Sequence, residues 1–252
     1  IVKNKLFIFA SAEYYRKSYP NVYNPYDGTY DNIELKNEVF LPDGTSLGKY
    51  FNAKMAQAML DHYKETYNME DITDSFTPHQ VTDRSINAMA RIDWNINDNN
   101  KLMFRYQHMD AYADKFSAGS YSYTYNNSSY KQSNKTNTFV LELNSRINDE
   151  ISNEFRATAV YVRDQRTPGY LGAGMYIQDN VTVNMGTEYS SGANSMASDT
   201  YTIADNLTVL KGNHNITVVT HNEIFKFNNV FIQYRCGQYN YSSIADFFTN
   251  QN

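Results

Sequence analysis

Hydrophobic and polar side chains alternate along residues 85–110, apart from a break of polar residues in the middle. Apolar residues therefore share one face of each arm and polar residues share the other, a pattern typical of a β-hairpin. Each arm is longer than an average strand of about 5–6 residues. This length leaves two environments open for the apolar face: a protein core or the hydrocarbon of a membrane.

The same alternation recurs elsewhere, and the whole chain predicts seven strands. The expected strands are residues 5–15, the two arms of 85–110, 137–147, 153–164, 200–210 and 215–225. In a membrane barrel, the polar faces of such strands would line the interior. The lumen-facing candidates are Arg91, Asp93, Arg105, Glu142 and Arg156.

Two charged residues interrupt the alternation. Asp205 has the parity of the apolar residues Ile203 and Leu207, which predicts either a β-bulge or a different register at this point. Arg163 has the parity of Tyr161. Its position is explained if it lies beyond the apolar band, near the outer rim of the sheet.

Short and long connections alternate strictly along the chain. Polar connections at 97–100, 148–152 and 211–214 are short, whereas 16–84, 113–136 and 165–199 are long. Outer-membrane barrels have short periplasmic turns and long extracellular loops. We therefore expect an all-β fold, an antiparallel up-and-down meander that forms a partial transmembrane β-barrel of about seven strands with long extracellular loops. A soluble all-β domain with decorated edges is the alternative.

The first long loop, 16–84, is an insertion that contains a helix candidate near residues 52–67. Asn52 is a suitable N-cap for this helix. One stripe of the helix is apolar and is expected to pack over the strand ends. The stripe consists of Met55, Ala56, Met59, Leu60, Tyr63 and Tyr67. In this interpretation residues 1–252 form one domain.

The other long loops are rich in tyrosine. Tyrosines at strand ends, such as Tyr112 and Tyr161, fit the aromatic girdle of a membrane barrel. Tyr121, Tyr123 and Tyr125 lie too deep in their loop for a girdle. They are therefore the candidates for contact with a ligand, a saccharide or a peptide.

Composition and motifs argue against several classes of function. The chain has 252 residues and a net charge of −5, without the basic stripe that a nucleic-acid partner requires. No apolar run of about 18 residues exists, so no transmembrane helix is encoded. The single cysteine cannot form an internal disulfide. The histidines lack chelating spacing, and phosphate-binding and nucleophile motifs are absent. We expect no enzymatic activity, no metal and no cofactor.

Several successive segments resemble one family. The opening IVKNKLFIFASAEYY resembles the segment that begins the barrel of TonB-dependent outer-membrane receptors, with Lys3, Asn4 and Lys5 as its turn. Residues 81–106 and 152–166 are similar to the next barrel hairpins of the Oar-like branch, whose members carry an N-terminal carboxypeptidase-regulatory-like domain. The resemblance covers nearly the whole chain, in order.

The resemblance implies a barrel of about 22 strands that is filled by a plug and imports scarce ligands with energy relayed through TonB. The present chain contains neither plug nor TonB box, and its seven strands leave two open edges, which a bilayer core does not tolerate. We therefore expect a fragment, the N-terminal third of such a barrel, in a Gram-negative outer membrane. The implied partners are outer-membrane lipid, the TonB system through the missing plug, and an unidentified ligand.

Two other functions remain open at this point. One is a secreted or surface all-β binding module that uses its Tyr-rich loops. The other is a porin-like barrel with passive flow.

Overall fold

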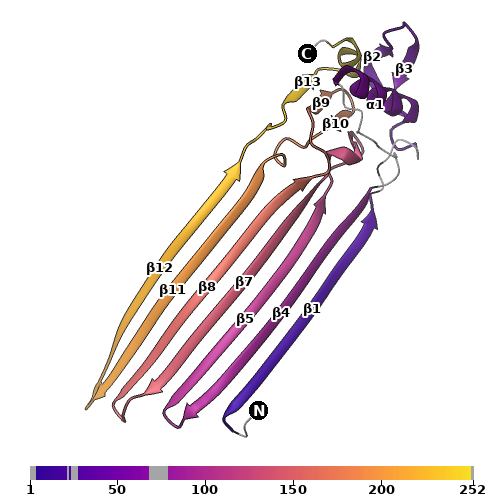
Figure 1. The fold of residues 1–252 in the computed structure, drawn as a ribbon. Coiled ribbons are helices and arrows are strands. Elements are labelled where there is room, and N and C mark those ends of the chain that lie inside the picture. The colour runs from indigo at the N-terminus through magenta and orange to yellow at the C-terminus, as the bar shows by residue number, and fades with distance from the viewer. Residues whose placement is uncertain (1–3, 22, 24–27, 68–78, 251–252) are drawn as a thin grey trace.

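The computed structural model describes residues 4–21, 23, 28–67 and 79–250, so the first three residues of the family-like opening and parts of the 16–84 insertion lie outside the described residues. Seven long strands form one antiparallel sheet whose spatial order follows the chain (Figure 1). The strands are β1 (Leu6–Pro20), β4 (Gln80–Asn97), β5 (Asn100–Lys115), β7 (Tyr130–Arg146), β8 (Ile151–Pro168), β11 (Asn194–Lys211) and β12 (His214–Phe231). The predicted up-and-down meander is confirmed.

The three short connections lie together at one end of the sheet, where the chain also begins (Figure 1). Asn97 and Asn148 each accept hydrogen bonds from backbone N–H groups two or three residues on, and Gly212 adopts a positive φ of 59°. Asparagine and glycine favour such turns because they stabilise or tolerate these backbone conformations. The predicted alternation of short and long connections is therefore present.

The strands are longer than the sequence pattern predicts. β7 begins at Tyr130 rather than near 137, and β11 begins at Asn194 rather than near 200. The seven strands have 15 to 18 residues, whereas about 9–11 suffice to cross a bilayer. The additional residues extend toward the long connections; in β7 the added residues 130–136 are almost all polar, so the alternation that marks a strand disappears there.

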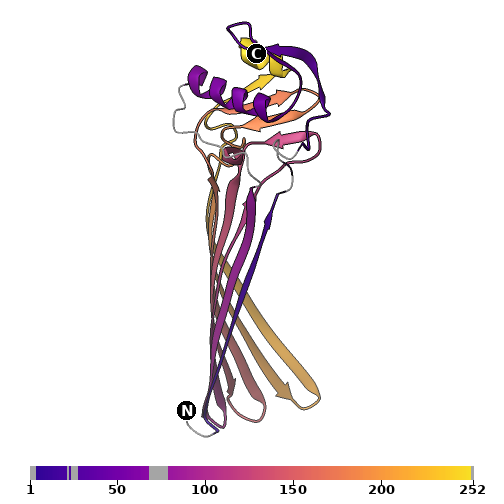
Figure 2. The ribbon, with the colours of Figure 1, turned by 90° about the vertical axis from the view of Figure 1, so that its right-hand side faces the viewer.

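The long connections are present as predicted, and they are folded. Together with the C-terminal segment they fold into a compact cap at one end of the sheet (Figure 2). The cap consists of β2 (Glu34–Phe40), β3 (Ser46–Tyr50), α1 (Ala53–Tyr67), β6 (Ser122–Thr124), η1 (Asn126–Ser128), β9 (Gly174–Gln178), β10 (Thr182–Met185), β13 (Gln238–Tyr241) and α2 (Ile244–Thr249). Its four-stranded sheet, β13-β9-β10-β6, includes parallel pairs. The antiparallel meander thus describes the large sheet alone.

Helix α1 forms as predicted and supplies much of the cap core. The Asn52 side chain accepts a hydrogen bond from the backbone N–H of Met55 at 3.0 Å, which caps the helix. The predicted stripe is buried from Met55 to Tyr63, whereas Tyr67 is half-buried at its end. Within the described ranges, neither α-helix is long and apolar enough to cross a membrane.

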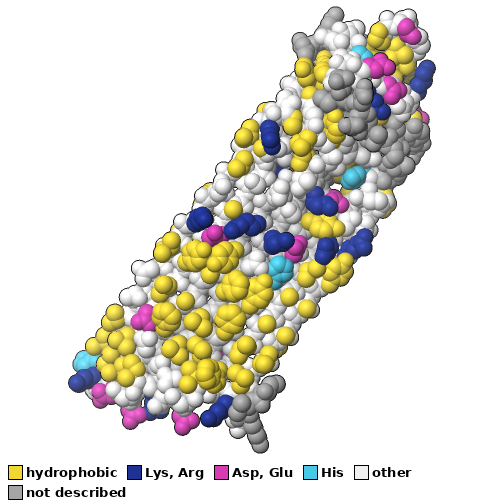
Figure 3. Space-filling view, viewed as in Figure 1, with side chains coloured by type: hydrophobic (Ala, Val, Ile, Leu, Met, Phe, Trp, Pro, Cys, Tyr) yellow, Lys and Arg dark blue, Asp and Glu magenta, His cyan; other side chains and the backbone are white. Residues whose placement is uncertain are grey.

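The continuous register of the seven strands separates an apolar face from a polar face. One row of the apolar face runs through Ile8, Ile92, Phe104, Leu141, Ala157 and Ile203. These side chains and their neighbours form the hydrophobic area in the half of the sheet that lies away from the cap (Figure 3). A belt of exposed apolar side chains on long strands fits contact with lipid.

The bulge expected at Asp205 is wrong. β11 pairs with β8 and β12 in unbroken register, and Asp205 stays on the apolar face. Its carboxylate instead accepts a hydrogen bond of 2.7 Å from Asn153 on β8. A neighbouring donor thus satisfies the misplaced charge without a change of register. Arg163 lies two residues beyond Tyr161, where an Asp199 carboxylate pairs with it at 2.6 Å.

Candidate functional site

The five predicted lumen-facing residues lie together on the polar face. Asp93, Glu142 and Arg156 belong to one row across the sheet, and Arg91 and Arg105 belong to the adjacent row. The sequence pattern therefore assigned all five to one face. That this face lines a lumen stays a prediction.

These residues form a network of ion pairs. Arg91 contacts Asp93 at 2.8 Å, and Arg156 contacts Glu142 at 2.7 Å. Arg105 lies directly opposite Arg91 across the strand pair, and its Nε is buried without a hydrogen-bond partner among the described residues. Arg156 also contacts Glu154 at 3.1 Å, so three arginines and three carboxylates lie close together on this part of the face.

The polar face also carries exposed aromatic side chains on the two outermost strands. Phe7 and Phe9 on β1 are 48% and 54% exposed, and Phe225 and Phe227 on β12 are 64% and 62% exposed. Register places all four on the same face as Arg91 and Glu142. Exposed apolar groups of this size mark surfaces that contact other protein or lipid.

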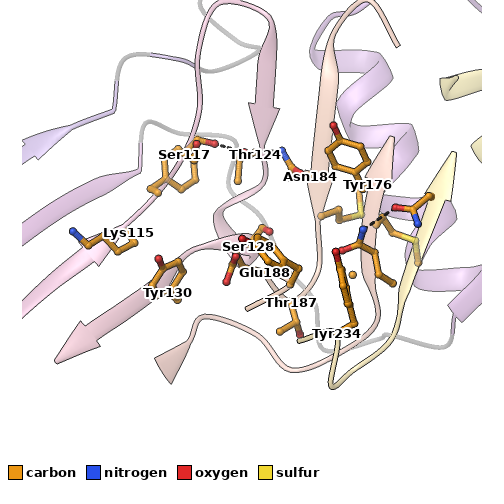
Figure 4. A pocket seen from close by; sticks show the side chains of 17 residues that line it. Lys115, Ser117, Thr124, Ser128, Tyr130, Tyr176, Asn184, Thr187, Glu188 and Tyr234 are labelled. Carbon is orange, nitrogen blue, oxygen red and sulfur yellow. Dashed lines mark hydrogen bonds between the residues drawn. The ribbon is translucent and has the colours of Figure 1, made fainter. Parts of the chain in front are cut away.

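A pocket of 740 Å³ lies where the polar face meets the cap (Figure 4). Lys115 and Tyr130 line it from the cap-side ends of β5 and β7, while β9, β10 and β13 of the cap close the other side. Its volume lies in the range of pockets that bind small molecules. This is the strongest candidate for a ligand site in the described part of the chain.

The cap contributes one row of hydrogen-bonding side chains to the pocket. Thr124, Asn184, Tyr176 and Asn240 are register neighbours on β6, β10, β9 and β13, and all four line the pocket. Asn184 Nδ2 donates to Thr124 Oγ1 at 3.3 Å, and Gln238 donates to Asn240 at 2.7 Å. Amides and hydroxyls offer donors and acceptors without net charge, which suits a neutral polar ligand.

Two further tyrosines add aromatic surface to the pocket lining. The rings of Tyr189 and Tyr234 lie 5.7 Å apart, and both side chains are about half exposed. Tyr234 has a φ of 54°, and its backbone N–H donates to the Tyr189 carbonyl at 2.7 Å. A left-handed conformation is uncommon for a residue other than glycine, asparagine or aspartate, and such strain concentrates at functional sites.

The charged residues that line the pocket are Lys115 and Glu188. Glu188 accepts hydrogen bonds from the hydroxyl of Ser190, which in turn accepts one from Arg166 at 2.7 Å. Burial raises the pKa of the Tyr130 phenol, although the nearby Arg166 guanidinium acts in the opposite direction. Tyr130 therefore remains a hydrogen-bond donor at neutral pH.

The three tyrosines predicted to contact ligand have different positions. Tyr123 and Tyr125 are 3% and 0% exposed and pack in the cap core, and the Tyr125 hydroxyl donates to the Ala56 carbonyl at 2.6 Å. This burial contradicts their predicted role. The Tyr123 ring packs against Tyr30, Phe51 and Tyr125. Tyr121 is 71% exposed, and its role stays a prediction.

The pocket residues themselves were not singled out by the sequence. Tyr130 comes from the predicted connection 113–136, Tyr176 and Tyr189 come from 165–199, and Tyr234 comes from the segment after β12. The only indication was the high tyrosine content, 23 residues in the chain. Among the described residues, no group of His, Cys, Asp or Glu is arranged to hold a metal ion.

Long antiparallel strands with an exposed apolar belt, short turns at one end and a folded cap at the other define a β-barrel type of membrane protein. Residues 1–252 match the family model of the outer membrane beta barrel domain, and the chain belongs to this family. The protein is therefore located in the outer membrane. Searches of curated proteins and of solved structures found no match.

Proposed function

We propose that the protein is an outer-membrane receptor of the TonB-dependent type, and that this chain forms part of its barrel. The resemblance of residues 1–15, 81–106 and 152–166 to successive barrel segments of that family supports the assignment. The role is transport of a bound ligand rather than catalysis. Ligand would enter through the pocket beneath the cap and then pass along the polar face.

The exposed phenylalanines on the polar face carry this proposal. In a water-filled pore, Phe9 and Phe225 would expose rings to solvent at an apolar cost of about 25 cal/mol per Å². A plug domain inside the barrel would cover them. This observation favours a plugged receptor over a porin-like barrel with passive flow.

The cap pocket indicates the kind of ligand. Tyr176, Tyr189 and Tyr234 offer aromatic surfaces, and the adjoining amides and hydroxyls offer hydrogen bonds. Saccharides and short peptides present both apolar faces and polar edges, so either class fits these walls.

Conductance and growth measurements test the proposal. The complete natural protein, inserted in a planar bilayer, should remain closed until urea unfolds the plug, whereas a porin would conduct at once. A strain that lacks the gene should lose growth on at least one saccharide or peptide nutrient, and loss of the TonB system should have the same effect. A constitutively open pore, or growth that does not depend on TonB, would refute the receptor assignment.

A further inference from the structure

The four-stranded sheet of the cap has one buried face and one open face. Met175, Ile177 and Val183 point into the cap core and are at most 2% exposed. The residues that alternate with them, together with their register neighbours, form the other face. We call it the open cap face; its members are Ser122, Thr124, Tyr176, Gln178, Thr182, Asn184, Gln238 and Asn240. All of them except Thr124 are exposed or half-buried.

The strands of this sheet contain no charged residue. Their sequences are SYT in β6, GMYIQ in β9, TVNM in β10 and QYNY in β13. Lys115 and Glu188, the charged residues of the pocket, lie outside the sheet. An ionised ligand group loses hydration on such a surface and gains no opposite charge, which is unfavourable. The open cap face therefore suits a ligand without charge.

Hydrogen bonds within the open cap face hold some of its groups and leave others for a ligand. Gln238 donates to Asn240 Oδ1 at 2.7 Å, which leaves the Asn240 amide nitrogen as a donor. Asn184 donates to Thr124 at 3.3 Å, which leaves the Asn184 amide oxygen as an acceptor. These two amides flank Tyr176 in the register of the sheet, as Figure 4 shows for Asn184 and Tyr176.

Tyr176 supplies an aromatic surface between the two amides. Its side chain is 37% exposed, and it makes no hydrogen bond or ring contact with the described residues. A sugar ring has apolar C–H faces and hydroxyl groups around its edge. An open tyrosine ring between a donor and an acceptor matches both features.

The open cap face extends beyond the pocket. A second cavity of 320 Å³ is lined by Gln178, Ser242 and Lys36, and Tyr176 and Asn240 line both cavities. The Lys36 ammonium donates to the Gln178 and Ser242 carbonyls at 2.5 and 2.8 Å, so it is already engaged with the backbone. The row from Thr124 to Asn240 crosses three interstrand spacings, about 14 Å in all, which is longer than one sugar ring.

We propose that the open cap face binds a neutral oligosaccharide, with one sugar ring on Tyr176 and further rings in the two cavities. A peptide fits this surface less well, because extended peptides bind sheets through backbone hydrogen bonds at a strand edge, whereas this surface is the face of a sheet. The charged termini of a short peptide would also find no opposite charge on it. The inference rests on the proposed function, since it names the class of ligand that the receptor would take.

Binding of defined glycans to the complete natural protein in detergent tests the assignment. The probes are neutral oligosaccharides of glucose, mannose, galactose and xylose, from disaccharides to octasaccharides, the same lengths with uronic acid units, and a library of hexapeptides. An array screen followed by calorimetric titration measures the affinities. At least one neutral oligosaccharide should bind, more tightly as its length increases. The assignment is overturned if no neutral oligosaccharide binds, or if peptides or acidic glycans bind more tightly.

Tyr176→Ala tests the aromatic contact. It should weaken binding of the neutral oligosaccharide at least about tenfold, the loss typical of an anchoring aromatic side chain. Tyr239→Ala is the matched control, because Tyr239 lies on the neighbouring strand β13 with a similar exposure of 38% but on the other face, with its ring 5.0 Å from that of Tyr67. The control should change the affinity less than about twofold. An equal loss in both variants would show that the open cap face is not the binding surface.

Gln178→Ala tests the extension into the second cavity, because Gln178 lines that cavity and not the pocket. Loss of one neutral hydrogen bond should weaken binding of the octasaccharide by about three- to tenfold. An unchanged affinity would show that the ligand ends at Tyr176 and would overturn the assignment of both cavities to one ligand.

These results are separable from those that test the receptor assignment, because binding to the purified protein requires no TonB system. A neutral oligosaccharide that binds, in a strain whose growth does not depend on TonB, would refute the transport proposal alone. TonB-dependent growth on a peptide, with no binding of neutral oligosaccharides, would refute the present inference alone.

Discussion

Leu141→Arg tests directly whether the apolar face of the large sheet meets lipid. Leu141 lies on β7 between Phe104 and Ala157 of the neighbouring strands, and it is 38% exposed. Lys135 on the same face and the turn residue Ile147 are each six residues away along the chain.

The expected cost follows from these distances. Six residues of a strand at about 3.4 Å each, tilted by about 40°, correspond to about 15 Å along the membrane normal. The hydrocarbon core is about 30 Å thick, so Leu141 lies near its middle. An arginine on the lipid face at this depth lowers the free energy of unfolding by about 2–4 kcal/mol.

Urea titration of the complete natural protein in lipid vesicles measures this difference. Thr138→Arg is the control, because Thr138 lies on the polar face of the same strand, opposite Gln107 and Val160. The control should change the stability by less than about 1 kcal/mol, as surface substitutions usually do. The face assignment is refuted if Leu141→Arg is tolerated, or if the two variants are equally unstable.

Three further predictions concern the cap. Gly186→Ala should destabilise the cap by about 2–5 kcal/mol, because φ is +77° and the new Cβ would lie 2.1 Å from the Ala173 carbonyl oxygen. Hydrogen exchange of the cap amides measures this change. The control is Gly44→Ala, which should cost only the backbone strain because nothing lies within 4 Å of its new Cβ. Burial lowers the pKa of His62, so folding disfavours protonation of its ring. The protection of cap amides against hydrogen exchange should therefore fall as the pH drops below the unfolded pKa of about 6.5. Protection that does not change with pH would contradict this. Tyr234→Gly relieves the strain of a left-handed backbone but removes an aromatic side chain from the pocket. We expect a stable protein that no longer takes up its nutrient. Retained uptake would exclude the pocket as the ligand site.

Sequence patterns predicted the membrane part of the fold well because one physical constraint repeats there at every second residue. From Ile86 to Ile96 on β4, lipid and the interior impose opposite preferences on successive residues. The turns followed from the asparagines that stabilise them. The five charged residues of the polar face could be grouped for the same reason, because parity alone decides the face.

The cap could not be predicted in the same way. Its sheet joins β6, β9, β10 and β13, which come from three different parts of the chain. Each strand has only three to five residues, too few for a clear period. Tyr125 illustrates the consequence: in a polar, Tyr-rich segment it resembles an exposed ligand contact, yet its neighbours in space are the buried residues of α1. The prediction of a bulge at Asp205 was wrong for a different reason. The donor that satisfies its carboxylate, Asn153, lies on another strand and is not evident from the pattern around Asp205.

The two outermost strands link the fold to the proposed function. β1 and β12 each have a hydrogen-bonded neighbour on one side only within the described sheet. In a bilayer, each unsatisfied backbone group costs several kcal/mol, so both edges require further strands as partners. The same two strands carry the exposed phenylalanines of the polar face; further strands would cover the sides of those rings but not the ends that point away from the sheet. The proposed plugged receptor would supply both further strands at the edges and a separate body beside the polar face.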